Sequence, residues 1–394
     1  MKSKRHIAIV INIGLAALLT PATSNADNQL SKDAQLALHA QMDHYAAVAR
    51  RGEQVFYTKK FDLSGLPHYQ PEQVLAGWIK IHGNNYINDG NLGEYWKQGF
   101  KKFQPGLHLS FFLPTSAATF SALYDNQADI GMGLGPKFYD LLAYERIMNY
   151  DPLAITVVTG SYDVSGWTNS FAVIVNAANP LTKITVDQLD GVFGAARDGG
   201  WAGTNWHTDW ARGPEKNIRT WGQLGLTGEW ADKRITPYGF SLRYNTSDFF
   251  ADKVLQGSDK WNEDLHAYAN YVKPDGTRSI EADQINDSMV KDRYGIAYLL
   301  FRGDRPGTKR LAVAPRGTTN YVDHTLENVQ NRTYPLFNEM FFYMNVRPGT
   351  PLDPKLKEFC RYVLSQEGQA EVQRDGKYLP LTAEVVREQL KKLE

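Results

Sequence analysis

The sequence has almost no cysteine and no surplus of either charge. Its one thiol, Cys360, cannot form a disulfide within the chain. Lys and Arg together number 43, as do Asp and Glu, so no excess positive charge exists to neutralise a nucleic-acid backbone. The composition therefore gives no support to nucleic-acid binding. We expect Cys360 to be an unreactive core thiol, because it falls on the apolar face of a C-terminal helix.

Long hydrophobic runs are also scarce, and the longest lies at the N-terminus. Residues 7–19 are apolar except for Asn12, follow three positive charges, and precede Ser-Asn-Ala at 24–26. This pattern is typical of a secretory signal peptide. As a helix the run would reach about 20 Å, too short for a hydrocarbon core of about 30 Å. The sequence predicts a signal peptide at 1–26, cleaved after Ala26, and a soluble periplasmic protein.

Motifs of catalysis are absent as well. The sequence has no Gly-x-Ser-x-Gly elbow, no His-Glu-x-x-His, no phosphate loop of Walker type and no Cys/His cluster with metal-ligand spacing. His39 and His44 fall on a predicted helix at 33–51. They are five residues apart and point in different directions around its axis. We therefore expect no enzyme activity, no cofactor and no metal site.

After residue 76 the sequence alternates between strand patterns and helix patterns. The predicted strands fall at 78–82, 107–113 and 129–132, and the predicted helices at 92–103 and around 120–124. Such alternation predicts an α/β protein with a mostly parallel sheet flanked by helices. A sheet of this kind receives ligands beyond the carboxyl ends of its strands.

Two nearly continuous apolar runs, 171–175 and 340–344, enclose a second α/β region with a strand at 295–300 and a helix at 247–255. Helical patterns return at 354–364 and 383–393. This arrangement predicts two lobes joined by a two-stranded hinge at the apolar runs. The expected divisions are an N-terminal extension at 27–75, lobe I at 76–172 and 340–394, and lobe II at 173–339.

Short stretches along residues 77–385 occur in the order found in one known family. They include ADIG at 128–131, VIVNAANP at 173–180, ITPYG at 235–239, YGIAY at 294–298 and LSQEGQ at 364–369. In this order the stretches resemble the periplasmic phosphate-binding proteins, the solute-binding components of phosphate ABC importers. The resemblance implies a type II periplasmic binding protein fold that closes like a Venus flytrap on a small oxyanion, above all phosphate. The implied partners are permease subunits in the inner membrane, and we expect a monomer.

The resemblance also implies where an anion would be held. The family uses hydroxyls and backbone N–H groups at helix N-termini, where donors are free and the helix dipole is positive, together with an Arg and an Asp. The family's Arg falls on Phe240. The positions implied here are Asn84, Asn85, Thr115, Ser116, Asp129, Asn245 and Thr246, with Arg243 near enough to substitute for the missing Arg.

Asp129 would decide which ligand is bound. A carboxylate repels an anion unless it accepts a hydrogen bond from it, and phosphate that keeps a proton can donate one whereas sulfate cannot. Asp129 is therefore expected to select protonated oxyanions. A neutral sugar or a phosphorylated organic molecule would also satisfy it, and a sensor or scaffold with the same fold is a further alternative. Ser116 and Thr246 also suit a purely structural role as helix N-caps.

An insertion at 195–216 departs from the simple family pattern. It carries Trp201, Trp206, Trp210 and His207. Such aromatic residues stack on sugar rings or partner surfaces, or form a small core over the second lobe. The sequence leaves both interpretations open.

Overall fold

The computed structural model describes residues 57–394, apart from the side chain of Asn88. The predicted signal peptide, the predicted helix at 33–51 and most of the predicted N-terminal extension lie outside the described residues. Within the described residues, no helix combines the length and the apolar character needed to span a bilayer.

The first sheet has five strands in the order β2-β1-β3-β16-β4. β1 is parallel to β2 and β3, whereas β16 runs antiparallel to both of its neighbours. The strands are β1 (Ala76–Gly83), β2 (Gly106–Phe112), β3 (Ile130–Gly133), β4 (Leu153–Thr159) and β16 (Glu339–Met344). The helices of this lobe are α2 (Tyr86–Asp89), α3 (Leu92–Lys101), α4 (Ala118–Tyr124), α5 (Phe138–Met148), α10 (Pro354–Val363), α11 (Gln366–Asp375) and α12 (Ala383–Lys391).

Helix α3 shows why these helices cover the sheet. Its Leu92, Trp96 and Phe100 recur every four residues and are all buried, so one face of the helix is apolar. The Trp96 ring packs edge-on against Phe342 of β16, with 5.9 Å between centroids. Cys360 of α10 is fully buried, and burial raises the pKa of its thiol to about 12. The expectation that Cys360 lies in the core is confirmed.

The second sheet has the order β10-β9-β13-β5-β14, and β5 is its antiparallel strand. Its strands are β5 (Phe171–Asn176), β9 (Thr236–Phe240), β10 (His266–Tyr268), β13 (Gly295–Leu300) and β14 (Thr308–Arg310). The helices of this lobe are α6 (Val186–Phe193), α7 (Asn245–Val254), α8 (Glu281–Lys291) and α9 (Leu326–Gln330).

Shorter elements complete this lobe. The strand pairs are β6 (Lys183–Thr185) with β15 (Ala312–Ala314), β7 (Gly200–Ala202) with β8 (Asn205–His207), and β11 (Tyr271–Val272) with β12 (Arg278–Ser279). Four single 3₁₀ turns lie at Thr208–Trp210, Pro214–Lys216, Trp221–Leu224 and Gly228–Trp230.

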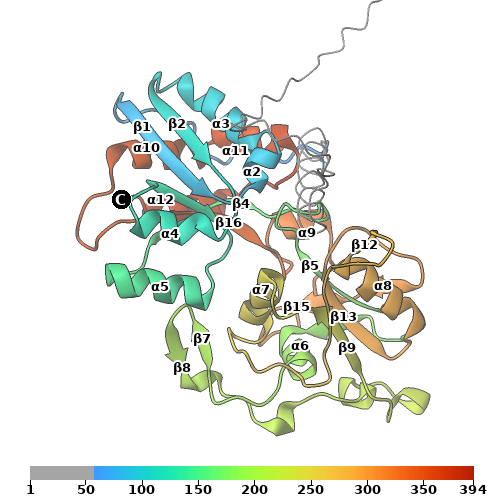
Figure 1. The fold of residues 1–394 in the computed structure, drawn as a ribbon. Coiled ribbons are helices and arrows are strands. Elements are labelled where there is room, and N and C mark those ends of the chain that lie inside the picture. Colours follow the sequence, from blue (N-terminus) through green and yellow to red (C-terminus); the bar gives the residue numbers. More distant parts are fainter. Residues whose placement is uncertain (1–56) are drawn as a thin grey trace, which may run out of the picture. The chain divides into compact units, whose positions relative to one another are not determined.

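The two sheets lie in separate lobes (Figure 1); the first contains blue to green elements together with the red C-terminal ones, and the second contains green to orange elements. In each sheet four strands run one way and one runs the other. The predicted architecture of two α/β lobes with mostly parallel sheets is confirmed.

The chain crosses between the lobes at 160–170 and 331–338. These crossings are hydrogen-bonded to each other, because the Gly160 N–H donates to the Asn338 carbonyl at 2.7 Å and the Asn338 amide donates to the Asn169 carbonyl at 2.9 Å. The hinge therefore does not lie in the apolar runs 171–175 and 340–344. Those residues lie in the ladders of β5 and β16, so the connections between the lobes are the segments that precede them.

Candidate functional site

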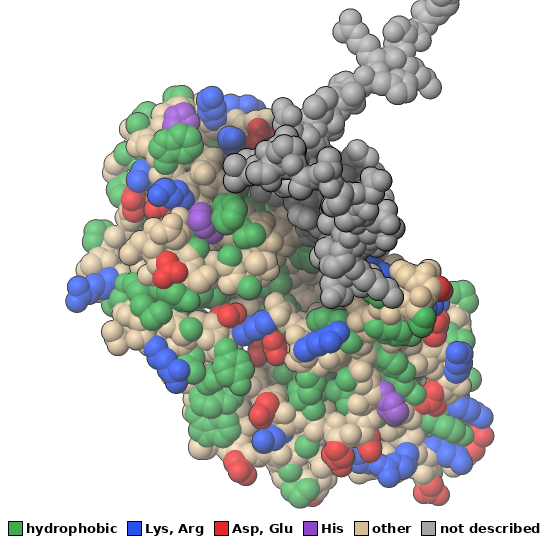
Figure 2. Space-filling view, viewed as in Figure 1, with side chains coloured by type: hydrophobic (Ala, Val, Ile, Leu, Met, Phe, Trp, Pro, Cys, Tyr) green, Lys and Arg blue, Asp and Glu red, His purple; other side chains and the backbone are tan. Residues whose placement is uncertain are grey.

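A cleft of about 220 Å³ lies between the lobes. On the first lobe it is bounded by the segment after β2, the carboxyl end of β3 and the start of α5; on the second lobe it is bounded by α7. Its lining residues include Thr115, Ser116, Gly135, Lys137, Asp140, Asn245 and Phe249. A hollow of about 170 Å³ shares Gly135 and Phe249 and continues toward the two crossings. Figure 2 shows basic and acidic side chains side by side between the lobes.

The lobe I wall is fixed by a buried amide. Asn84 follows β1 and is fully buried; its Nδ2 donates to the Ser116 hydroxyl at 2.7 Å, and its Oδ1 accepts the Tyr86 N–H at 2.8 Å. Asn84 therefore positions Ser116, and both polar atoms of the Asn84 side chain have hydrogen-bond partners within the protein. Thr115 and Ser116 line the cleft just before α4.

The lobe II wall begins at Asn245, the first residue of α7. Its Oδ1 accepts a hydrogen bond from the Lys137 ammonium, which comes from the other lobe. The same ammonium lies 3.5 Å from the Asp248 carboxylate, and the Lys137 side chain is 27% exposed. One lysine thus joins the two walls.

Several carboxyl groups lie in or beside this cleft, and burial raises their pKa values. Burial raises the pKa of Asp140 and of Asp248, and the Lys137 charge opposes the rise in both. Burial, and then the Asp248 charge one helical turn away, raises the pKa of Asp252 to about 6. The Asp252 carboxylate still reaches solvent, which weakens this effect. Burial lowers the pKa of Lys253. Burial therefore favours the neutral form of the carboxyl groups in and beside the cleft.

Asp129 lies away from this cleft. It precedes β3, and its Oδ2 accepts the backbone N–H of Lys80 at 2.7 Å. The cleft is at the other end of this four-residue strand, roughly 13 Å away at about 3.3 Å per residue. Because ligands gather at the carboxyl ends of parallel strands, a residue at the amino end is on the wrong edge of the sheet. The structure does not bring Asp129 to the other predicted site residues.

Three more predicted residues do not line the cleft. Asn85 donates to the Asp89 carboxylate at 2.8 Å. Arg243 is exposed and donates to the Tyr244 hydroxyl and to a backbone carbonyl, at 3.3 Å each. Thr246 lies in the first turn of α7. The structure thus brings Thr115, Ser116 and Asn245 together, with Asn84 behind Ser116.

The residues that sequence reasoning missed are Lys137, Asp140 and the acidic residues of α7. A signal for the first two was present, because the glycines at 133 and 135 and Pro136 follow a predicted strand at its carboxyl end, where ligand-binding loops occur. Asp248 and Asp252 are four residues apart, which places them on one helix face.

The insertion forms a clasp, defined here as the β7–β8 hairpin, which extends from the second lobe to α5 (Figure 1). The Thr204 hydroxyl lies 2.7 and 2.8 Å from the two Glu145 carboxylate oxygens. The Trp201 ring packs on Phe138 with 4.7 Å between centroids. Other insertion aromatics pack within it: Trp201 on Trp206 at 4.9 Å and His207 on Trp210 at 4.2 Å. The insertion aromatics pack on one another and reach the opposite lobe, but none of them is buried and Trp206 is 46% exposed, so both interpretations stay open.

A family model described as a PBP superfamily domain matches residues 154–367, more than half of the chain. The chain belongs to this superfamily. The matched region of this PBP-superfamily chain includes both crossings and every strand of the second sheet. In the described part of the chain, no group of three or more His, Cys, Asp or Glu residues is placed to hold a metal ion.

Three proteins similar to this chain are described as phosphate-binding proteins or as a phosphate transport receptor. The phosphate-binding protein PstS of Pseudomonas aeruginosa is 27% identical over 329 residues, which cover 83% of this chain and 90% of that one. A phosphate-binding protein PstS of Staphylococcus epidermidis is 25% identical over 155 residues, 39% of this chain and 42% of that one. The structure of an ABC-type phosphate transport receptor from Vibrio cholerae is 15% identical with a TM-score of 0.46, covering 76% of this chain and 99% of that one.

Proposed function

We propose that this chain is an exported solute-binding protein that captures a small oxyanion, above all phosphate, between its lobes and delivers it to an ABC permease. The observation that supports this best is the cleft in which Ser116, Lys137 and Asn245 meet from both lobes. Its volume of about 220 Å³ suits a tetrahedral oxyanion. The similarity to phosphate-binding proteins along most of the chain supports the same ligand.

Each group has a role in this proposal. The Lys137 ammonium supplies the positive charge, and the Ser116 hydroxyl and the Asn245 amide donate hydrogen bonds. Helix α7 begins at Asn245 without a side-chain cap, so its first backbone N–H groups are open to an anion at the positive end of the helix dipole.

We assign to Asp140 the selecting role that the sequence suggested for Asp129. Asp140 lines the cleft together with Lys137. A carboxylate in this position accepts a hydrogen bond from a phosphate that keeps one proton, and it repels fully ionised sulfate.

Closure completes the site. The groups come from two lobes that are joined at 160–170 and 331–338, so a ligand held by both stabilises the closed arrangement over the open one.

One observation favours a second candidate, a neutral polyhydroxyl ligand. The cleft and its adjoining hollow contain Asp140, Asp252 and Glu339 against Lys137 and Lys253. Carboxylates accept hydrogen bonds from sugar hydroxyls without charge repulsion.

The test uses mature protein stripped of ligand by unfolding and refolding. Thermal unfolding is measured with phosphate, arsenate, sulfate, an organic phosphate and a panel of sugars. A ligand at 100 times its Kd adds about 2.7 kcal/mol to the native state. We expect phosphate and arsenate to stabilise the protein more strongly than sulfate does.

Variants locate the binding. Lys137→Ala should remove the part of the phosphate response that arises in the cleft, whereas Lys97→Ala on the exposed face of α3 should preserve the full response. Asp140→Asn should admit sulfate. Stabilisation by a sugar and by no oxyanion would overturn the phosphate assignment in favour of the polyhydroxyl ligand.

A further inference from the structure

A separate pocket of about 420 Å³ lies on the second lobe, outside the interlobe cleft. It is formed by α6, the insertion and the segment after β15. Its charged lining includes Arg197, Arg212, Lys216 and Arg316 on the positive side, and Asp187 and Asp190 on the negative side. The cleft of the proposed function shares none of these residues.

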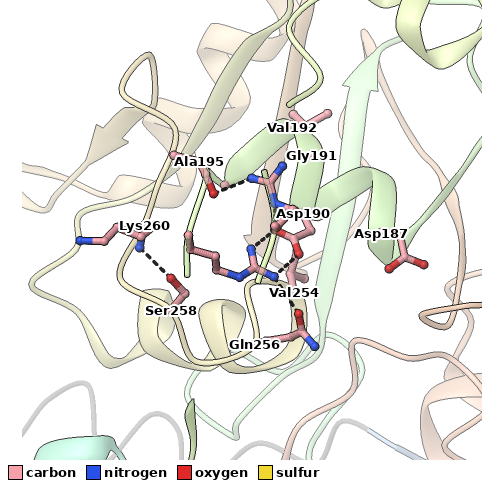
Figure 3. A network of polar contacts seen from close by, with 12 residues as sticks. Asp187, Asp190, Gly191, Val192, Ala195, Val254, Gln256, Ser258 and Lys260 are labelled. Atoms are coloured by element: carbon pink, nitrogen blue, oxygen red, sulfur yellow. Dashed lines mark hydrogen bonds and ion pairs between the residues drawn. The ribbon is translucent and has the colours of Figure 1, made fainter. Parts of the chain in front are cut away.

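Asp190 lies at the centre of this pocket's buried side and is 1% exposed. Its two oxygens each accept a 2.6 Å hydrogen bond from Arg197. The Arg212 Nε lies 3.2 Å from one oxygen and the Arg316 Nη1 3.4 Å from the other. In Figure 3, dashed lines join one guanidinium group to both Asp190 and Gln256. One carboxylate thus faces three guanidinium groups.

The remaining carboxylates do not balance this charge. Asp187 accepts hydrogen bonds from Arg316 at 2.8 Å and from the Gly317 N–H at 2.7 Å. Asp209, at the rim, is 75% exposed and lies beside His207. Lys216 is exposed and adds a fourth positive charge. The buried side of the pocket therefore keeps an excess of positive charge.

Arg212 has donors that the protein leaves unused. Its side chain is 7% exposed. Its Nη2 donates to the Ala195 carbonyl at 2.7 Å, but its Nη1 has no hydrogen-bond partner among the described residues. An unpaired buried donor destabilises the folded protein, and more so when it is charged. Burial lowers the pKa of Arg212; the Asp190 charge opposes this effect, and the neighbouring arginines add to it.

We propose that this pocket binds a small tetrahedral oxyanion with two negative charges, such as phosphate or sulfate, independently of the interlobe cleft. Guanidinium groups present parallel N–H donors that match such an oxyanion. The anion would pair with Arg212, Lys216 and Arg316 of the pocket lining, and it would offset the excess charge around Asp190. Since Arg212 and Lys216 belong to the insertion and Arg316 to the lobe body, the anion would also link the insertion to the second lobe.

The test separates this site from the cleft by variants of the full chain. In the Lys137→Ala/Asn245→Ala protein, equilibrium dialysis with radiolabelled phosphate, and separately with sulfate, should still detect one site per chain that accepts both anions. In this background, Lys216→Ala should weaken the remaining binding at least threefold and Arg212→Gln at least tenfold. The exposed Arg234 pairs with Asp264 on the same lobe and offers a matched control. Arg234→Gln should leave the remaining anion binding unchanged.

Two outcomes would overturn the proposal. One is a folded Lys137→Ala/Asn245→Ala protein, as judged by its thermal transition, that binds neither anion. The other is residual binding that Lys216→Ala leaves intact; because Lys216 is exposed, this variant does not threaten the fold. If the cleft instead binds a sugar, native protein would show phosphate binding that Lys137→Ala leaves unchanged and Lys216→Ala weakens, so the two proposals fail separately.

Discussion

His324 lies buried in lobe II beside the first crossing between the lobes. Its Nε2 is 2.7 Å from the Ser170 hydroxyl, and its ring packs against Tyr162 and Tyr334 with centroids 4.8 and 4.6 Å away. Burial, and then the charge of Arg310, lowers the pKa of this histidine to about 3. His324 is therefore neutral in the folded protein at every pH at which the protein would work.

This burial predicts a specific acid sensitivity. The unfolded chain has an ordinary histidine pKa of 6.5, so it takes up a proton below that pH while the folded chain does not until about pH 3. The contribution to stability is complete above pH 7 and is lost progressively as the pH falls from 6.5 toward 3. It should lower the free energy of unfolding by about 2 kcal/mol between pH 7.5 and 5.

Urea unfolding of native and His324→Gln protein at these two pH values measures this contribution. The variant should lack the 2 kcal/mol decrease, whereas His266→Gln, a change at an exposed histidine of the same lobe, should keep it. An equal decrease in native and His324→Gln protein would show that another group carries the acid sensitivity.

Single residues also show which features could be predicted from the sequence and which could not. The burial of Cys360 was predictable, because apolar neighbours at helical spacing define a buried face without knowledge of the rest of the molecule. Asp129 was misplaced because a motif gives the identity of a residue but not the end of the strand that meets the ligand. Lys137 was missed because its position in the site depends on a second lobe more than 100 residues further along the chain.

At the scale of elements, the clasp predicts slower opening of the cleft. The Thr204 hydroxyl can donate to only one Glu145 oxygen at a time, and a part-buried bond of this kind contributes roughly 1 kcal/mol. Thr204→Ala should therefore speed ligand release about fivefold while the association rate changes little. Stopped-flow tryptophan fluorescence with the ligand found by thermal unfolding measures both rates.

Thr319→Ala is the control for the clasp, since Thr319 is exposed and lies in the same lobe far from α5 in sequence. It should release ligand at the native rate. Equal release rates for the native and Thr204→Ala proteins would mean that the clasp contact does not resist opening.

Helices and strands were predictable where hydrophobic periodicity in the sequence indicates which of their faces are buried. The strand β13 begins and ends at the predicted residues because both of its faces are buried in the second sheet. Helix α11 was not predicted, because its sequence is mostly polar and its burial depends on hydrogen bonds. Its Gln369 is fully buried and donates to the carbonyls of Val157 and Val363. No local sequence pattern predicts these contacts.

At the scale of the whole molecule, Gly160 holds the two crossings in contact. A Cβ at this position would lie 2.1 Å from the Thr168 carbonyl oxygen in the same crossing and 2.9 Å from the Asn338 carbonyl oxygen in the other, so any larger residue must displace the backbone of both crossings. Gly160→Ala should lower the free energy of unfolding by about 2 kcal/mol or more, as overpacking of a rigid interior does. Urea unfolding checks this.

Gly65→Ala is the comparison, because its added Cβ would meet only the Cβ of Ala383, at 3.3 Å. It should cost clearly less than Gly160→Ala. Similar losses in the two variants would mean that the crossings yield easily, and that the hinge is softer than its hydrogen bonds indicate.

The place of β16 sets the order in which the protein can assemble. β16 lies between β3 and β4, although the whole of lobe II separates it from both along the chain. The strands of the second sheet follow one another within 171–310, so that sheet can form first. The first sheet stays split until residues 339–344 are available, and contacts between such distant segments form slowly. The half of the chain that is synthesised first should thus be the half that finishes folding last.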